Sequence, residues 1–208
     1  MVAMIDIDEF LPEVLVYAPS TSDLIAYRHI ISAARDICDR AKVWRENDEF
    51  AITTPELQGL LTIADAEIIT IESAALDGVD LTPTTAAWLD QEYKGWDRQT
   101  DLSNARFVTQ QSWNTLSIYP RQEGTFSGRF VLKPARRASQ LPEFLLREYA
   151  EDIGKGAASK ILTLPTQESI PQLGLDLRSW FESRLGALAV KAAKGQQNAR
   201  LRTKGAYL

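Results

Sequence analysis

Apolar and polar side chains recur with helical spacing between Ser20 and Arg45. The apolar positions are separated by three or four residues, which places them on one face of a helix. They are Leu24, Tyr27, Ile30, Ile31, Ala34, Ile37, Cys38 and Ala41. Ser20 and Asp23 form a capping pattern at the start, with Pro19 just outside the helix. We expect this helix to be the spine against which later helices pack, and a β-like segment to begin at Trp44.

The spacing changes to that of β-strands over residues 43–81. Residues 67–76 are rich in Ile and Thr, which favour strands. The dipeptide Asp77-Gly78 follows immediately. It favours a tight hairpin turn, because both central positions of such a turn need positive φ. The sequence therefore predicts a hairpin at this point.

A short helix is predicted over residues 82–93, with Pro83 in its first turn. Three short β-like runs then occupy residues 105–134, and Pro120 and Pro134 end two of them. Short strands joined by short loops are typical of an antiparallel meander.

Two further amphipathic segments predict long helices. The first, residues 141–164, contains Gly154 and Gly156. Each glycine inside an exposed helix costs about 1 kcal/mol relative to alanine. Close approach by another backbone, from a neighbouring subunit, would explain them; a weak helix is the alternative. The second segment covers residues 171–194, and the chain after Gly195 has no helical face.

These elements predict an α+β fold, namely a helical bundle of about three long helices with an inserted antiparallel β-rich region and an extended C-terminal arm. The predicted parts are the N-terminal segment with the first bundle helix (1–44), the β-rich insertion with a short helix (45–140), two later bundle helices (141–194) and the arm (195–208). The first three parts are expected to form one compact unit.

Charge is distributed unevenly along the chain. The formal net charge is −5 and the pI is about 5.0, which argue against nucleic-acid binding over the whole surface. From residue 191 onward there are five basic side chains and no acidic one, namely Lys191, Lys194, Arg200, Arg202 and Lys204. The preceding residues keep 18 basic and 28 acidic side chains, a formal charge of −10. This asymmetry indicates that the tail has its own binding partner; a solvated terminus is the alternative.

The sequence offers few residues for catalysis or metal binding. Cys38 is the single cysteine, and its place on an apolar helix face predicts a buried, inert thiol in a protein that assembles in a reducing compartment. His29 is the single histidine, and we expect it at the surface or at an interface. These two residues satisfy neither zinc spacing nor a Ser–His–acid set. We therefore expect no enzyme, no catalytic or metal site and no cofactor.

Targeting and membrane segments are not expected either. Residues 1–11 are acidic and lack the long apolar core of a signal peptide. No apolar run is long enough to cross a membrane, so we expect no membrane partner.

Five segments of the chain follow one another in a familiar order. They are AARDICDRAKVWR, EIITIESAALDGVDLTP, WNTLSIYP, FVLKPARRASQLPEFLLREYAEDIGKGAASKILTLP and LRTKGAYL. In this order and spacing they resemble the head–tail adaptor (connector) family of tailed bacteriophages, over residues 11–208. None of the segments is a catalytic motif.

The resemblance implies a structural role in the virion, at the head–tail junction, after assembly in the host cytoplasm. Such adaptors form a ring, commonly of twelve copies, beneath the portal ring. The ring extends the channel for DNA ejection and provides the platform for tail proteins of the nozzle or tail tube. Their C-terminal arm docks into the portal protein. The portal-binding residues implied here are Lys191, Lys194, Arg200, Leu201, Arg202, Lys204, Tyr207 and Leu208.

The chemistry of the tail fits this expectation. Its basic side chains can pair with acidic portal groups, and Tyr207 and Leu208 can fill an apolar pocket. A negatively charged body would repel phosphates, so double-stranded DNA could pass through the channel without specific binding.

Two other function classes are alternatives. The first is a small acidic protein whose basic tail binds nucleic acid, with an affinity that falls steeply with salt. The apolar end of the tail argues against it. The second is an enzyme, which would need a constellation of residues that the sequence lacks.

Overall fold

The structure is a computed structural model that describes residues 2–53, 59–96, 104–165 and 169–194. Its backbone contacts divide the chain into two compact units. The sheet unit runs from Trp44 to Lys133, and the helical unit combines Val2–Val43 with the chain from Pro134 onward.

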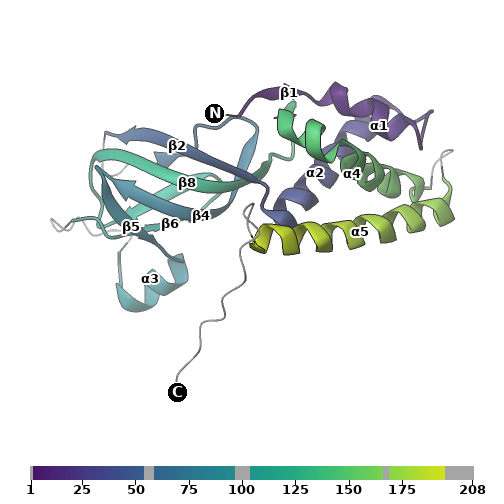
Figure 1. Cartoon of the computed structure of the whole chain (residues 1–208). Coiled ribbons are helices and arrows are strands. Elements are labelled where there is room, and N and C mark those ends of the chain that lie inside the picture. The colour runs from purple at the N-terminus through teal and green to yellow at the C-terminus, as the bar shows by residue number, and fades with distance from the viewer. Residues whose placement is uncertain (1, 54–58, 97–103, 166–168, 195–208) are drawn as a thin grey trace, which may run out of the picture. The chain divides into compact units, whose positions relative to one another are not determined.

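The helical unit combines the first segments of the chain with its later helices (Figure 1). Its elements are β1 (Met4–Asp6), the 3₁₀ helix η1 (Ile7–Phe10), α1 (Leu11–Leu15), α2 (Asp23–Ala41), β9 (Gln140–Pro142), α4 (Glu143–Leu162) and α5 (Pro171–Lys194). Strands β1 and β9 pair antiparallel, with Ile5 opposite Leu141. Helices α2, α4 and α5 contact one another, and α1 packs on α2 and α4. Helix packing and a strand pair therefore both hold the segment before β2 against the segment after β8.

Helix α2 buries the apolar stripe predicted from the sequence, except at its start. Ile37 and Cys38 are completely buried. Leu24, by contrast, is 80% exposed. The predicted cap at Ser20 is wrong, because the N-cap residue is Ser22 and its side chain makes no capping hydrogen bond. The first turn of α2 is thus only weakly tied to the core.

Helix α4 contains two glycines because other parts of this chain approach them closely. A Cβ atom at Gly154 would lie 2.7 Å from the carbonyl oxygen of Glu13. A Cβ atom at Gly156 would lie 2.8 Å from the ring of Phe181. The predicted approach of another backbone is confirmed at Gly154, but that backbone is α1 of the same chain. A side chain at either position would push α4 away from α1 or from α5.

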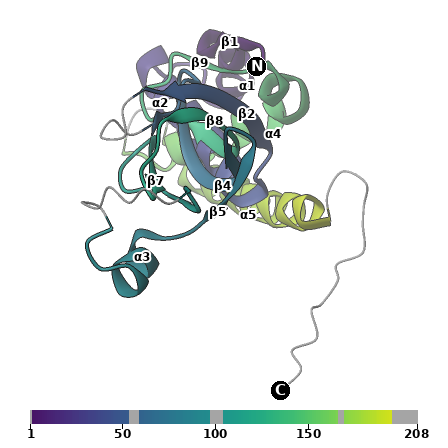
Figure 2. The same cartoon turned by 90° about the vertical axis from the view of Figure 1, so that its left-hand side faces the viewer.

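The sheet unit is built from strands that lie far apart in the sequence. Its elements are β2 (Trp44–Ile52), β3 (Gly59–Leu60), β4 (Ala66–Leu76), β5 (Val79–Pro83), α3 (Ala86–Glu92), β6 (Phe107–Thr109), β7 (Thr115–Tyr119) and β8 (Gly124–Pro134). The strands are hydrogen-bonded in the order β2-β8-β4-β5-β6-β7-β3. Seen from the side of the sheet unit, the sheet is curled (Figure 2). The Asp48 carboxylate on β2 accepts a hydrogen bond from Thr62 N, just after β3, at 2.7 Å. This bond links the two ends of the strand order.

Several turns of the sheet unit carry residues with positive φ, among them the turns at Asp77-Gly78 and at Asn114. Asp77 and Gly78 have φ of 48° and 79°, so the predicted hairpin turn is confirmed. Asn114 has φ of 56°, and its side-chain amide makes hydrogen bonds to the backbone at the start of β4. Asn114 Oδ1 accepts from Ile68 N at 3.0 Å, and its Nδ2 donates to Ala66 O at 2.6 Å. The turn before β7 is thereby fixed to the start of β4.

Helix α3 starts later than predicted. Pro83 is the last residue of β5, and the helix begins at Ala86 behind the N-cap Thr85, whose Oγ1 accepts from Trp88 N at 3.2 Å. The helix is held by an aromatic cluster. Its members are Trp88, Tyr93, Trp96, Phe107 and Tyr119. Ring packing therefore attaches α3 to β6 and β7.

The predicted fold class is wrong. The chain is a strand-rich α+β protein with a curled sheet and a separate two-stranded sheet, not a bundle of about three long helices with a β insertion. The predicted antiparallel meander holds only in part: β6 and β7 pair antiparallel, but β8 pairs with β2 and β4 and not with β7. Local periodicity located several strands of the large sheet but not β1 or β9, and the distant pairing of β2 with β8 gives the sheet its own core. The extended arm that was part of the prediction lies outside the described residues.

Candidate functional site

The candidate site implied by the sequence begins at the end of α5, and the structure shows how α5 is held. Arg184 Nε donates to Asp152 Oδ1 and Oδ2 on α4, at 3.0 and 3.2 Å. Lys155 Nζ lies 4.0 Å from the centroid of the Trp180 ring. Lys155 also forms an ion pair with Glu151, which raises the pKa of the lysine and lowers the pKa of the carboxyl. Ionic and cation–π contacts thus fix α5 against α4.

Few of the predicted portal-binding residues can be located. Lys191 is exposed on the last turns of α5, and Lys194 is the last residue of that helix. The other predicted residues lie outside the described residues: Arg200, Leu201, Arg202, Lys204, Tyr207 and Leu208. The structure therefore places the base of the predicted arm on a well-anchored helix.

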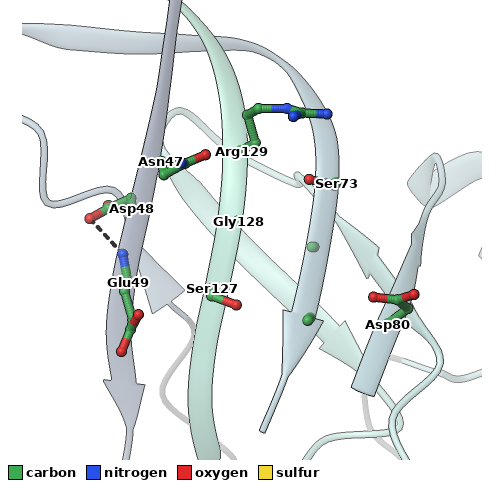
Figure 3. A pocket seen from close by; sticks show the side chains of 10 residues that line it. Asn47, Asp48, Glu49, Ser73, Asp80, Ser127, Gly128 and Arg129 are labelled. Atoms are coloured by element: carbon green, nitrogen blue, oxygen red, sulfur yellow. Dashed lines mark hydrogen bonds between the residues drawn. The ribbon is translucent and has the colours of Figure 1, made fainter. Parts of the chain in front are cut away.

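The sheet unit carries a hollow of about 390 Å³ on its surface (Figure 3). Its lining comes from β2, β4, β5 and β8. The polar lining residues are Asn47, Asp48, Glu49, Ser73, Asp80, Ser127 and Arg129. The backbone of Gly128 also lines the hollow, and a Cβ atom at this position would come within 2.9 Å of the rings of Phe126 and Phe130. Gly128 therefore leaves room for these two buried rings on the core side of β8.

The charged groups of the hollow are partly committed to structural contacts. Asp48 is buried and accepts hydrogen bonds from Glu49 N and Thr62 N. Arg129 Nε pairs with Glu72 Oε2 at 3.0 Å, and Arg45 Nε pairs with the other oxygen of Glu72 at 2.8 Å. In the described part of the chain, no group of histidine, cysteine and acidic side chains is arranged to hold a metal ion. The hollow offers hydroxyl, amide and carboxylate groups for polar contacts.

His29 and Cys38 lie in the helical unit. His29 is half-buried, and burial together with the positive charges of Lys160 and Arg28 lowers the pKa of its imidazole. Lys160 Nζ in turn donates to Ser32 Oγ at 2.7 Å and pairs with Asp36. The predicted burial of the Cys38 thiol is confirmed.

None of the helices in the described part of the chain combines the length and the apolar character that a bilayer crossing requires.

No protein-family model matches the chain, and no curated protein matches it at a significant level. The resemblance to head–tail adaptors therefore remains a prediction from the sequence.

Sequence reasoning missed the contacts that hold α5. The adjacent acidic residues Glu151 and Asp152 suggest a solvated helix face, but the Asp152 side chain is only 6% exposed. A signal was present in the sequence: the apolar residues Leu145, Tyr149, Ile153, Ala157 and Ile161 recur every four positions, and Asp152 precedes one of them, so it borders the buried face. The hollow could not have been found, because its residues come together only through strand pairing.

Proposed function

We propose that this chain is a head–tail adaptor of a tailed bacteriophage. In this proposal, twelve copies form a ring beneath the portal, extend the channel for DNA ejection and provide the platform for tail proteins. The C-terminal arm of each copy docks into the portal protein. The proposal includes assembly in the host cytoplasm and a place at the head–tail junction of the virion.

One observation carries the proposal: an anchored helix leads directly into a basic segment with an apolar end. The Arg184–Asp152 pair holds α5, and Lys191 is exposed near its end. The residues that follow include Arg200, Arg202 and Lys204, and the sequence ends in Tyr207-Leu208. Basic side chains suit acidic partner groups, and an aromatic–aliphatic pair suits an apolar pocket.

Ring symmetry strengthens such a joint. An extended segment loses conformational entropy when it binds, so a single arm contact is weak. Many arms on one ring bind the portal together, and the effective concentration of each unbound arm is then high. The body before residue 191 has a formal charge of −10, which opposes tight binding of the DNA that moves through the channel.

The test is co-assembly with purified portal rings. A chain that lacks residues 196–208 should fold but fail to join portals in negative-stain electron microscopy and sedimentation. The matched control replaces Arg136 and Arg137, two exposed basic residues between β8 and β9, with glutamine and should join normally. If the truncated chain still joins portals like the full chain, the role assigned to the arm is wrong.

The basic tail also suits a second candidate function, nucleic-acid binding. Its five basic side chains would then contact phosphates, and the affinity for duplex DNA would fall steeply between low and physiological salt. A salt titration with the full and truncated chains separates the two functions. Portal binding without measurable DNA binding supports the adaptor, and the reverse supports the alternative.

A further inference from the structure

The sequence contains one Asp-Gly dipeptide, Asp77-Gly78, and it forms the turn between β4 and β5. Both residues are exposed, and Leu76 pairs with Val79 across the turn. A Cβ atom at Gly78 would have no heavy atom within 4 Å. The space around Gly78 is therefore open to solvent.

An aspartate that is followed by glycine can isomerise, because glycine has no side chain to hinder attack by its own nitrogen. The Gly78 nitrogen would attack Cγ of Asp77. An N–Cγ bond forms, the C–OH bond of the carboxyl breaks, and the hydroxyl leaves as water with the amide proton. Water then opens the five-membered succinimide ring at either carbonyl. Opening at Cγ restores aspartate, and opening at the backbone carbonyl gives isoaspartate, with no net change in mass.

The conformation of the turn opposes this attack. The φ values of Asp77 and Gly78, 48° and 79°, are those of a two-residue type I′ turn. In such a turn ψ of the first central residue is about 30°. Cβ of Asp77 and the nitrogen of Gly78 then lie on opposite sides of the Cα–C bond, whereas the ring needs them on the same side. That bond must rotate by more than about 100° before Cγ can reach the nitrogen.

Contacts with the start of β8 hold the turn in this conformation. Asp77 N donates to Thr125 O at 2.9 Å, and Thr125 N donates to Asp77 Oδ1 at 2.8 Å. The backbone and the carboxylate of Asp77 are thus tied to the same residue. The carboxyl group cannot turn toward the Gly78 nitrogen without losing the second hydrogen bond.

Gly124 leaves room for the carboxylate in this position. A Cβ atom at Gly124 would overlap Asp77 Oδ2 and would lie 2.9 Å from Asp77 Cγ. Gly124 also has φ of 151°, a value that other residues rarely adopt. A side chain at position 124 would therefore push the carboxylate of Asp77 away from Thr125 N.

We propose that Asp77 is an isoaspartate site that its contacts with Gly124 and Thr125 keep unreactive in the folded chain. The reaction proceeds when the turn leaves β8, through unfolding or local opening. The product has one extra methylene in the backbone of a two-residue turn, so the pairing of Leu76 with Val79 is lost. This inference is independent of the proposed function.

Isomerisation of the folded and the unfolded chain tests the proposal. The full chain is kept at neutral pH in buffer and in guanidinium chloride, and isoaspartate at position 77 is measured by proteolysis, chromatography and mass spectrometry. The folded chain should isomerise at least about tenfold more slowly. Equal rates would overturn the protection by β8, and no isoaspartate in either sample would overturn the site.

Asp77→Asn provides a readout by mass. The amide keeps an acceptor oxygen for Thr125 N and loses ammonia in the same cyclisation, so that hydrolysis leaves a heavier product. Across a denaturant series, the rate of deamidation should rise with the unfolded fraction measured by circular dichroism. A rate that is already maximal in the folded chain would overturn the proposal.

Gly124→Ala tests the contact itself. In the folded chain it should raise the rate of isoaspartate formation at Asp77 by about two- to tenfold, the effect of one lost hydrogen bond. Gly95→Ala is the matched control, because Gly95 has φ of 78° but a Cβ atom there would have nothing within 4 Å. Equal rates in the two folded variants would overturn the role of Gly124. If Gly124→Ala does not fold, the denaturant series with Asp77→Asn decides.

Discussion

Arg184 on α5 donates from one nitrogen to both carboxylate oxygens of Asp152 on α4, at 3.0 and 3.2 Å. The Asp152 side chain is 6% exposed, whereas that of Arg184 is 45% exposed. The carboxylate is therefore largely removed from water. The ion pair with the Arg184 guanidinium offsets the free-energy cost of burying this charge. This pair fixes the helix from which the predicted arm continues.

Removing the arginine should destabilise the helical unit. Arg184→Ala leaves a nearly buried carboxylate without its cation, and we expect a loss of about 1–3 kcal/mol, less than for a fully buried pair because the arginine is half exposed. Urea unfolding followed by far-UV circular dichroism measures the change. Arg178→Ala, an exposed arginine on the same helix, is the control and should alter stability by less than about 0.5 kcal/mol. Equal stability of the two variants would mean that the pair contributes nothing.

Two glycines in the helices should respond to alanine in opposite directions. Gly154→Ala places a methyl group 2.7 Å from the Glu13 carbonyl oxygen, and should cost about 1–3 kcal/mol because α1 must move. Gly186→Ala fills open space and should stabilise the free chain by about 0.5–1 kcal/mol. Thermal unfolding of both variants at a low protein concentration, where self-association is weak, gives the comparison. A stabilising Gly154→Ala would show that α1 does not lie against α4.

His29 should make stability depend on pH. Its folded-state pKa is lowered below the ordinary value of 6.5 by burial and by Lys160 and Arg28. Below pH 6.5 the unfolded chain binds a proton that the folded chain does not, so stability falls as pH drops toward the folded pKa. The slope is at most about 1.4 kcal/mol per pH unit for one proton.

Replacement of the histidine isolates this contribution. His29→Gln cannot titrate, so the stability difference between the wild type and this variant should change between neutral pH and pH 5 and be constant above pH 7.5. The measurement is urea unfolding over that range. A difference that does not change with pH would exclude His29 as the source.

Local features of the fold could be predicted from the sequence, and pairings between distant segments could not. The chemistry of Asp77 and Gly78 requires positive φ, so that turn was recognisable. The stripe through Ile30, Ile37 and Cys38 also predicted the buried face of α2. These features depend on neighbours within a few residues.

The wrong fold class came from contacts of long range. The pairing of Trp44 with Leu132 joins residues on strands that no local pattern connects. Because of this pairing, the predicted β-rich insertion (45–140) is in fact a compact unit, Trp44–Lys133, with its own core. Burial of Asp152 was equally hidden, because its partner Arg184 comes from the next helix. The candidate arm was recognised by its charge, by the lack of a helical face after Gly195 and by the resemblance, and none of these specifies a structure.

The central claim of the proposal is that this chain binds the portal ring through its basic C-terminal segment. An electron microscopy map of the completed head–tail junction tests it most directly. The account predicts density for residues 196–208 inside the portal ring, with the side chains of Arg200 and Arg202 beside acidic groups and Tyr207 in an apolar pocket. A map in which these residues contact no other chain would contradict it.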